Sequence, residues 1–153
     1  MNYFLTLPFT LIINMAGNIT FTIIKPDAVK NGYIGDILAA IIKGGFTIKG
    51  LKMLRMNNQE AEAFYGIHKD REFFKSLVGF MISGPIVVAV IKKENAVEDF
   101  RKLIGSTDPA KAAEGTIRKR FAESVQENAV HGSDSDENAL VESGFFFSTK
   151  ELI

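Results

Sequence analysis

Cysteine is absent from this 153-residue sequence, which excludes a disulfide framework, a thiol nucleophile and a thiolate metal site. The absence is compatible with a reducing cytoplasm, and a cytoplasmic protein is our expectation. Net charge is absent too, because 18 basic residues balance 18 acidic ones. No general electrostatic field therefore favours nucleic acid or an anionic membrane as a partner. A phosphate-bearing ligand would have to be bound by a local cluster of cations.

Several common nucleotide and metal motifs are also missing. No Gly-x-x-x-x-Gly-Lys-Ser/Thr loop occurs, and no Gly-x-Gly-x-x-Gly opens the first helix, so neither a P-loop nor a dinucleotide-binding fold is expected. The two histidines have no spacing to each other or to carboxylates that indicates zinc. Chemistry must therefore come from residues dispersed along the chain.

The length and composition are sufficient for one globular domain with a hydrophobic core, since 46% of the residues are hydrophobic and 24% are charged. The N-terminal residues 3–13 are almost wholly apolar but too short to span a bilayer. A secretory signal or anchor is the less favoured interpretation, because no Lys or Arg precedes this run and no small-x-small cleavage site follows it. We expect Met15 to be the true start, residues 1–14 to be an extension outside the core, and residues 15–153 to form the domain.

Hydrophobic periodicity predicts strands alternating with helices. Strands are predicted at 20–24, 46–55, 86–91 and 145–147, and helices at 34–42, 57–64, 73–81, 94–104 and from Asp134 or Asp136 to 142. The run at 86–91 is apolar on both faces and is expected to be central. Gly50 interrupts the alternation of its strand, which indicates a bulge. The pattern predicts an α/β sandwich, one sheet with helices packed on it.

Residues 105–131 form a longer connection than a compact domain needs, and long connections of this kind are usually functional. Groups suited to phosphate are distributed over this segment and its surroundings: Lys25 at a strand end, Arg101 in a helix, Thr107 in a turn, Arg118 in the connection, and His131. A neutral imidazole has a free lone pair and can attack phosphorus without a separate base. Phosphoryl transfer then needs positioning and positive charge on the equatorial oxygens, which the cations and Thr107 would supply.

Five segments, in order along the chain, resemble nucleoside diphosphate kinases over about residues 16–147. They are TIIKPDAV (22–29), REFF (71–74), SGP (83–85), GSTDPAKAAEGTIR (105–118) and NAVHGSDS (128–135). The resemblance implies a ferredoxin-like βαββαβ core with a four-stranded antiparallel sheet covered by helices. It also implies ping-pong transfer of a γ-phosphoryl group, mainly from ATP, to nucleoside diphosphates. Mg²⁺ would be the cofactor, held mainly by the nucleotide phosphates, with no dedicated metal ligands in the protein. A homo-oligomer, tetramer or hexamer, is implied as well.

The resemblance also implies a role for each matching residue. His131 would be the phosphorylated nucleophile, with Ser133 and Glu142 holding its ring and Gly132 leaving room for the phosphoryl group. Lys25 and Tyr65 would lie beside the transferred group, and Arg101, Thr107 and Arg118 would hold the β- and γ-phosphates. Asn128, with Lys25, would bind the ribose hydroxyls. Phe73, backed by Val125, would stack on the base.

Less specific interpretations stay open for some of these residues. Phe73 and Val125 would also suit an ordinary core, and Phe74 competes with Phe73 for the stacking role. Tyr65 would suit helix packing, and Glu142 would suit a solvated helix end. His68, beside Lys69 and Asp70, is interpreted as a surface histidine.

The chain departs from the family pattern at Glu72, where proline is common, and at Lys119–Arg120, where an acidic residue is often found. Two other functions remain as alternatives. A phosphohistidine carrier or signalling protein would not need the ribose, base and triphosphate contacts, and a catalytically inactive nucleotide-binding module would be expected to lack His131 or Lys25.

Overall fold

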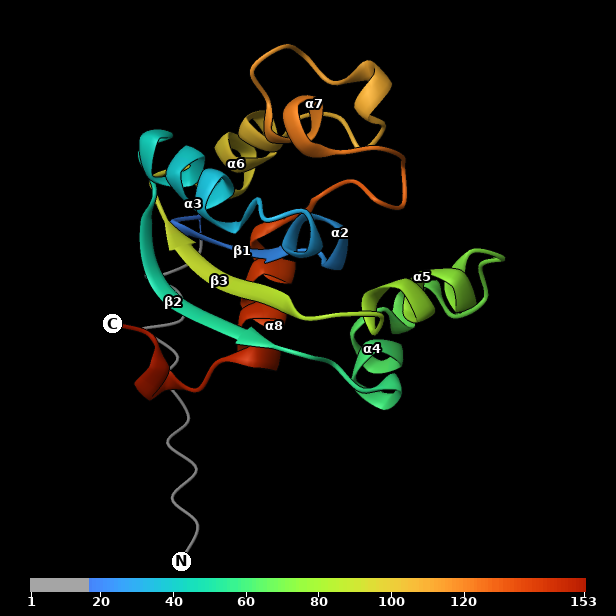
Figure 1. The fold of residues 1–153 in the computed structure, drawn as a ribbon. Helices are drawn as coiled ribbons and strands as arrows, with labels where there is room; N and C mark the ends of the chain where they lie inside the picture. The colour runs from blue at the N-terminus through green and yellow to red at the C-terminus, as the bar shows by residue number, and fades with distance from the viewer. Residues whose placement is uncertain (1–16) are drawn as a thin grey trace, which may run out of the picture.

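A four-stranded antiparallel sheet forms the centre of the computed structural model, which describes residues 17–153 (Figure 1). The extension expected at residues 1–14 lies outside the described residues. The strands are β1 (Ile19–Ile24), β2 (Thr47–Leu54), β3 (Ile86–Lys92) and β4 (Val130–Gly132), in the order β2-β3-β1-β4. All three neighbouring pairs are antiparallel. This order, with helices in the crossovers, confirms the expected ferredoxin-like α/β sandwich.

Helices cover both faces of the sheet. They are α2 (Pro26–Lys30), α3 (Ile34–Lys43), α4 (Asn58–Phe64), α5 (Phe74–Met81), α6 (Ala96–Ile104), α7 (Ile117–Phe121) and α8 (Asp136–Phe146), with 3₁₀ turns η1 (Gly66–His68), η2 (Pro109–Lys111) and η3 (Thr149–Glu151). Strand β1 contributes side chains to two hydrophobic cores, because successive side chains of a strand point to opposite faces of the sheet. Ile24 belongs to the core with α3 and α6, whereas Phe21 and Ile23 belong to the core with α4, α5 and α8.

Local sequence features act as expected at several elements. Asn57 and Glu60 form a reciprocal capping box at the start of α4, with distances of 2.8 and 2.9 Å. The register of β2 against β3 shifts between Ile48 and Gly50, so the bulge is confirmed. A Cβ at Gly50 would lie 2.9 Å from side-chain atoms of Leu152 and Phe147, so the bulge is also where the C-terminal segment packs closest.

The prediction of a last strand at 145–147 is wrong. Phe145 and Phe146 complete helix α8, and the fourth strand is the three-residue β4, which pairs with β1. A strand this short shows no alternation in the sequence. The helix continues because Phe146 stacks on Phe21 at a centroid distance of 5.4 Å and an angle of 3°, a tertiary contact that overrides the aromatic strand preference.

One smaller prediction about a helix start also needs correction, and one helix was missed. The cap of α8 is neither Asp134 nor Asp136 but Ser135, whose side chain accepts the N–H of Asn138 at 3.1 Å. Helix α2 begins with Pro26 and is absent from the helices that the sequence predicts, because a five-residue helix shows little periodicity. Proline is also well suited to a first helical position, since its missing N–H would be unpaired there in any case.

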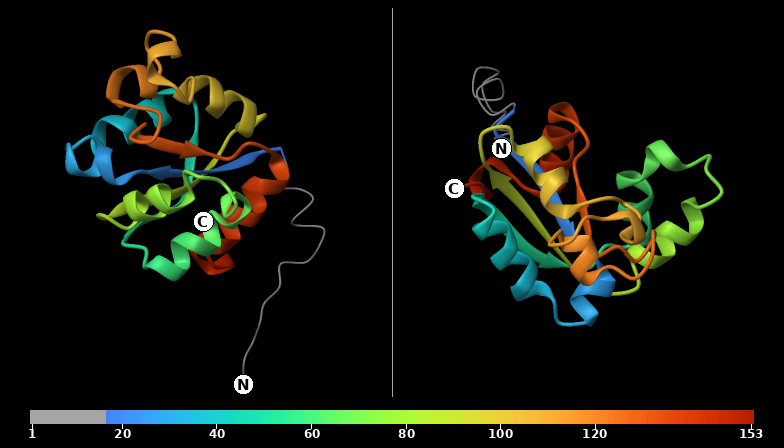
Figure 2. Two further views of the ribbon diagram at one scale, coloured as in Figure 1. Left: turned by 90° about the vertical axis from the view of Figure 1, so that its right-hand side faces the viewer. Right: turned by 90° about the horizontal axis from the view of Figure 1, so that it is seen from above.

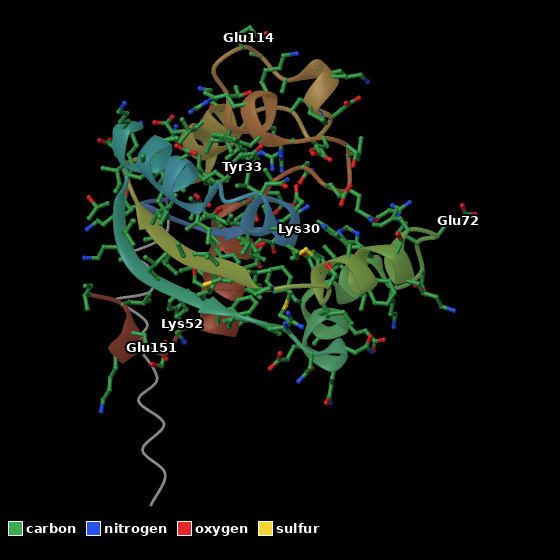
Figure 3. The ribbon with its side chains drawn as sticks, viewed as in Figure 1. Lys30, Tyr33, Lys52, Glu72, Glu114 and Glu151 are labelled. Carbon is green, nitrogen blue, oxygen red and sulfur yellow. The ribbon has the colours of Figure 1, made fainter. Side chains whose placement is uncertain are left out.

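The C-terminal segment lies along the outer side of β2. The N–H of Ile153 donates to the carbonyl of Lys49 at 2.9 Å, and Lys52 pairs with Glu151 (Figure 3). Because β2 and β4 are the two edge strands, this segment lies at the opposite edge of the sheet from β4. Among residues 17–153, no helix combines the length and apolar character needed to cross a membrane.

Candidate active site

A cleft of about 1210 Å³ opens between the α4–α5 pair and the long connection from α6 to β4. The two flanking segments lie on the same side of the molecule, the connection above and the α4–α5 pair below, in Figure 1 and in the left view of Figure 2. Ser76 of α5 donates its hydroxyl to Oε1 of Gln126 in the connection at 2.9 Å. Nine of the residues singled out in the sequence line this cleft: Lys25, Tyr65, Phe73, Arg101, Thr107, Arg118, Val125, Asn128 and His131. A cleft of this size suits a ligand as large as a nucleotide.

His131 lies in β4, opposite Ile23 of β1, so the central sheet fixes its backbone. Its Nε2 is 2.7 and 3.0 Å from the two carboxylate oxygens of Glu142 on α8. Ser133 donates its hydroxyl to the same carboxylate at 3.1 Å. Glu142 and Ser133 therefore do not line the cleft but lie behind the ring, and Glu142 is not a solvated helix end.

The contact with Glu142 decides which nitrogen of the ring is reactive. A carboxylate accepts hydrogen bonds, so the neutral imidazole next to it carries its proton on Nε2 and has its lone pair on Nδ1. The rings of Phe21 and Phe64 flank the imidazole at centroid distances of 6.2 and 5.8 Å and limit its rotation. A fixed ring with a free Nδ1 is what a nucleophilic histidine requires.

Lys25 is the last extended residue before α2, and its side chain is buried at the floor of the cleft. Its Nζ donates to Oδ1 of Asn128 at 2.8 Å. Burial, followed by the positive charge of Arg118, lowers the pKa of Lys25 to about 8, whereas the charge of Asp27 opposes the shift. The ammonium group is therefore held in a place where an anionic ligand would stabilise its charge.

Arg118 projects from α7 and is buried, although it is charged. It donates to the carbonyl oxygens of Gly105 at 3.0 Å and Val130 at 2.9 Å, so it ties the α6 end of the connection to β4. Burial and, secondarily, the charge of Arg101 lower its pKa to about 10. Arg101 and Thr107 are exposed on the same wall of the cleft. Two guanidinium groups that affect each other's charge and have no carboxylate partner in the described part of the chain are suited to bind polyphosphate.

Asn128 is buried, and its side chain makes hydrogen bonds with three neighbours that leave one lone pair of Oδ1 unused by them. Besides accepting from Lys25, it donates to the carbonyl oxygens of Val125 at 2.9 Å and Thr107 at 3.3 Å. The side chain of Asn128 thus connects Lys25 at the end of β1, the turn at Thr107 and the cleft rim at Val125. A ligand hydroxyl beside Asn128 and Lys25 would meet an acceptor and a donor in fixed positions.

The rim of the cleft is apolar. Phe73 is 50% exposed and Val125 is 57% exposed, and both line the cleft, so neither is an ordinary core residue. Phe74 instead packs against the core, which separates the two competing phenylalanines. Glu72, the departure from the family pattern, lies at the outer tip of the loop before α5 (Figure 3). An exposed aromatic ring and an aliphatic side chain that line the same cleft are suited to bind a flat base.

Tyr65 lies deeper, at the end of α4. Its side chain is buried and contributes to the core, as the packing interpretation expected, but its hydroxyl faces the cleft region without a hydrogen-bond partner among residues 17–153. Burial, followed by the negative charge of Glu142, raises its pKa. The phenol therefore keeps its proton, and its hydroxyl is a buried donor without a partner among the described residues.

One sequence-based interpretation of this region needs correction. His68 is not simply a surface histidine, because it lines the cleft and its ring centroid is 5.5 Å from that of Phe73. No pattern in the sequence distinguished it from its charged neighbours. Gly132 lines the cleft, and a Cβ there would lie 3.0 Å from Phe100 and 3.1 Å from Ile104. Its small size therefore also lets α6 pack against β4, and its role in leaving room for a phosphoryl group stays a prediction.

The parts of this site define a class of protein. A histidine with its Nδ1 free, a buried lysine and two arginines surround one cleft that also has an aromatic rim. Such a set is suited to covalent phosphoryl transfer to and from a nucleotide.

Comparison with known proteins gives the particular family. Residues 18–152 match the family model of nucleoside diphosphate kinase. A nucleoside diphosphate kinase of Flavobacterium psychrophilum is 56% identical over 137 residues, which cover 90% of this chain and 99% of that protein. One of Lawsonia intracellularis is 56% identical over 134 residues, 88% of this chain and 97% of that protein.

Solved structures agree. The Aquifex aeolicus nucleoside diphosphate kinase superimposes with a TM-score of 0.86 at 44% identity, covering 88% of this chain and 98% of that one. The Halobacterium salinarum enzyme in complex with CDP gives a TM-score of 0.85 at 36% identity, covering 88% and 90%. The chain belongs to the nucleoside diphosphate kinase family, and it is a phosphotransferase. The expected family, fold class and enzyme class are confirmed.

Proposed function

We propose that this enzyme moves the γ-phosphoryl group of a nucleoside triphosphate, mainly ATP, to a nucleoside diphosphate through a phosphohistidine on His131. The main support is the contact between its Nε2 and Glu142 at 2.7 Å, which leaves the Nδ1 lone pair free. Family membership supports the overall two-step, ping-pong reaction.

In the first step, Nδ1 of His131 attacks the γ-phosphorus, and a P–N bond forms as the bond to the bridging oxygen breaks. The electron pair of that bond leaves with the nucleoside diphosphate. The ring becomes an imidazolium, whose Nε2–H is held by the carboxylate of Glu142. In the second step, an oxygen of another diphosphate attacks the same phosphorus and the ring returns to its neutral form. One histidine thus divides one transfer into two.

The cations would bind the triphosphate. Lys25 and the Tyr65 hydroxyl would bind the transferred group, while Arg101, Thr107 and Arg118 would bind the β- and γ-phosphates. Support comes from the lowered pKa values of Lys25, about 8, and Arg118, about 10. Asp27 offsets only part of the effect of burial on Lys25, and no carboxylate among residues 17–153 does so for Arg118. Positive charge already in place where negative charge develops needs no reorganisation during reaction.

The nucleoside would be bound at the other end of the cleft. Asn128 and Lys25 offer an acceptor and a donor to the ribose hydroxyls, and Phe73, backed by Val125, stacks on the base. Stacking is available to every base, which favours broad acceptance of purines and pyrimidines. A related enzyme was solved with the pyrimidine nucleotide CDP, which is consistent with that breadth.

Mg²⁺ is proposed as the cofactor, and the residues fit its delivery on the nucleotide. Glu98 is the only carboxylate among the described residues lining the cleft, whereas lysines and arginines predominate. Mg²⁺ in nucleotide enzymes commonly keeps water and phosphate oxygens as ligands. When bound, the ion would neutralise phosphate charge, and the side chains named above would orient the nucleotide around it.

The test uses labelled ATP without an acceptor. The protein is exposed to Mg²⁺ and γ-labelled ATP, isolated, and then given unlabelled GDP or CDP in separate reactions. The proposed kinase retains label on His131 and releases it to both acceptors. Retention without release would indicate the alternative phosphohistidine carrier, and no retention would indicate an inactive nucleotide-binding module.

We also propose that the enzyme assembles into a homo-oligomer. A homo-oligomer, tetramer or hexamer, is supported by exposed Leu51 and Met53 on the edge strand β2, whose apolar side chains would favour a second copy. Sedimentation equilibrium would distinguish the two sizes.

A cytoplasmic location remains our expectation. We also propose that a chain starting at Met15 folds and turns over normally, and inactivity of that shorter chain would show that residues 1–14 belong to the domain.

A further inference from the structure

A strained turn lies between Asn128 and His131. Ala129 has a φ of 72°, a left-handed conformation that residues with a Cβ rarely adopt. Across it, the N–H of Val130 donates to the carbonyl of Asn128 at 2.9 Å, which makes it a γ-turn of the rarer form with positive φ. Such conformations persist only where the surrounding structure holds them. Something must therefore hold Ala129.

Asp27, at the start of α2, contacts this turn directly. Its Oδ2 accepts the N–H of Ala129 at 3.0 Å in a buried hydrogen bond. The N–H of Lys25 donates to the carbonyl of Ala129 at 2.9 Å. The peptide groups on both sides of the Ala129 Cα are thus bound by one short segment. Because Ala129 is fully buried, water cannot replace either partner.

The chemistry of Asp27 is unusual for a residue that only fills space. It is 9% exposed, and its Oδ1 has no hydrogen-bond partner among residues 17–153. Burial raises the pKa of this carboxyl, although the Ala129 N–H and the charge of Lys25 counteract part of the shift. Burying a carboxylate costs free energy unless it is hydrogen-bonded. The hydrogen bond to the N–H of Ala129 therefore explains Asp27 at this position better than packing does.

The turn also connects Asn128 and His131, whose side chains are both held by neighbouring residues. On one side, the Asn128 side chain is fixed by Lys25 and by two carbonyl oxygens. On the other, His131 is fixed by its pairing with Ile23 and by Glu142. The conformation of Ala129 sets the separation of these groups.

We propose that Asp27 is a positioning residue for phosphoryl transfer, which holds the Ala129 turn so that a ribose bound at Asn128 presents its phosphates to Nδ1 of His131. The inference rests on the proposed roles of Asn128 and His131. Binding of the ribose then contributes to the transfer step itself, because a bound nucleotide is already aligned for attack. Without Asp27, ribose binding and attack by His131 are no longer coupled.

The experiment compares ATP with 3′-deoxy-ATP in single-turnover phosphorylation of the protein. The ratio of the two values of kcat/KM measures how much the ribose hydroxyl contributes to transfer. We expect the unmodified protein to favour ATP strongly and Asp27→Ala to reduce that preference by about tenfold. A substitution that only lowers the amount of folded protein slows both nucleotides equally and leaves the ratio unchanged.

Val88→Ala is the matched control. Val88 is fully buried on the opposite face of the sheet, so its truncation destabilises the protein without touching the turn. The preference for ATP should be the same as in the unmodified protein. If Val88→Ala reduced the preference as much as Asp27→Ala does, general destabilisation would explain the effect and the positioning role would be overturned.

Asp27→Asn decides the question if Asp27→Ala yields no folded protein. The amide oxygen can still accept the N–H of Ala129, but the NH₂ group then occupies the buried position of Oδ1, which has no partner among the described residues. We expect the preference to fall by about threefold, since the hydrogen bond is weakened but not removed. An unchanged preference in Asp27→Asn would overturn the inference in that case.

Failure of the inference differs from failure of the proposed function. If the unmodified protein showed no preference for the ribose hydroxyl, or carried no phosphate on His131, the roles assigned to Asn128 and His131 would be wrong. If it showed both and Asp27→Ala kept the preference within about twofold, only the role of Asp27 would be overturned.

Discussion

Glu142 holds Nε2 of His131 between its two carboxylate oxygens, at 2.7 and 3.0 Å, and thereby determines which ring nitrogen faces the cleft. The pair joins the last long helix, α8, to the shortest strand, β4. Its consequence is chemical as well as structural, because an imidazole with the wrong tautomer presents an N–H where a lone pair is needed.

Glu142→Ala should therefore lower the rate of His131 phosphorylation more than it lowers stability. We expect a loss of about 10²-fold in kcat, because the ring is free to adopt the other tautomer and the imidazolium formed in the reaction loses its partner. Single-turnover phosphorylation by Mg·ATP measures the loss. Glu137→Ala, an exposed residue in the first turn of the same helix, is the control. Equal effects of the two substitutions would contradict the assignment.

Much of the fold was predictable because its features are local. The capping box of Asn57 and Glu60, the bulge at Gly50 and the doubly apolar strand β3 each depend on a few adjacent residues. The misplaced last strand was not predictable in this way. Phe146 is helical because it stacks on Phe21, 125 positions earlier in the chain, and β4 is too short to show any alternation.

The site shows the same division. His131 and the cations were recognisable as residue types suited to phosphate, and the family motifs placed them in one cleft. The cleft position of His68 and the contact of Asp27 with Ala129 were not recognisable. Both depend on segments brought together only by the fold, and neither has a distinctive sequence neighbourhood. The packing role of Gly132 against Phe100 was missed for the same reason.

The pKa of Lys25, about 8, predicts a pH dependence of the reaction. The protonated amine is the form that binds phosphate, and it is lost as the pH rises through the pKa. The value of kcat/KM reports the free enzyme, so we expect it to fall as the pH rises above about 8, by up to about tenfold per pH unit. Arg118 stays charged across this range, because its pKa is about 10.

Lys25→Arg is the matched variant for this profile. A guanidinium remains protonated at these pH values, so the fall near pH 8 should disappear even if the different shape lowers the overall rate. Cytidine nucleotides are the appropriate substrates, since their base does not ionise in this range. A flat profile to about pH 9.5 in the unmodified protein would show that Lys25 does not act through its charge.

Arg101 and Arg118 should differ from each other when each is replaced by alanine. Both changes should lower kcat/KM by about 10²-fold, because each removes a charge from the phosphates in the transition state. Arg118→Ala should in addition lower the Tm, because the carbonyl oxygens of Gly105 and Val130 lose their donors, at about 1–3 kcal/mol for each buried group. Arg101 is exposed, so its replacement should leave the Tm nearly unchanged.

Lys119 and Arg120 supply the controls for this comparison. Lys119 is 4.0 Å from Glu114 and Arg120 lies over the ring of Phe121 at 4.6 Å, and neither lines the cleft. Glu114 lies at the outer end of the long connection (Figure 3). Alanine at either position should have little effect on kcat/KM. Similar losses at all four positions would indicate a general basic surface instead of directed phosphate contacts.

The proposed phosphohistidine gives the most direct prediction, because only two histidines exist in the sequence. After brief exposure to Mg·ATP, we expect an acid-labile, alkali-stable phosphate on Nδ1 of His131. His131→Ala should abolish turnover, since no other described group in the cleft offers a neutral lone pair in the same place, while nucleotide binding by the cations and Phe73 persists. Mass spectrometry under alkaline conditions identifies the modified residue, and equilibrium dialysis measures the binding.

His68→Ala is the comparison that makes this test specific. His68 lines the same cleft but lies against Phe73, with a centroid distance of 5.5 Å, and no carboxylate among residues 17–153 contacts its ring. Its loss should leave phosphorylation intact and raise KM by no more than about threefold, as expected for one weak contact at a partly exposed ring. Phosphate found on His68, or near-normal turnover by His131→Ala, would overturn the assignment of the nucleophile and with it the mechanism built on Glu142.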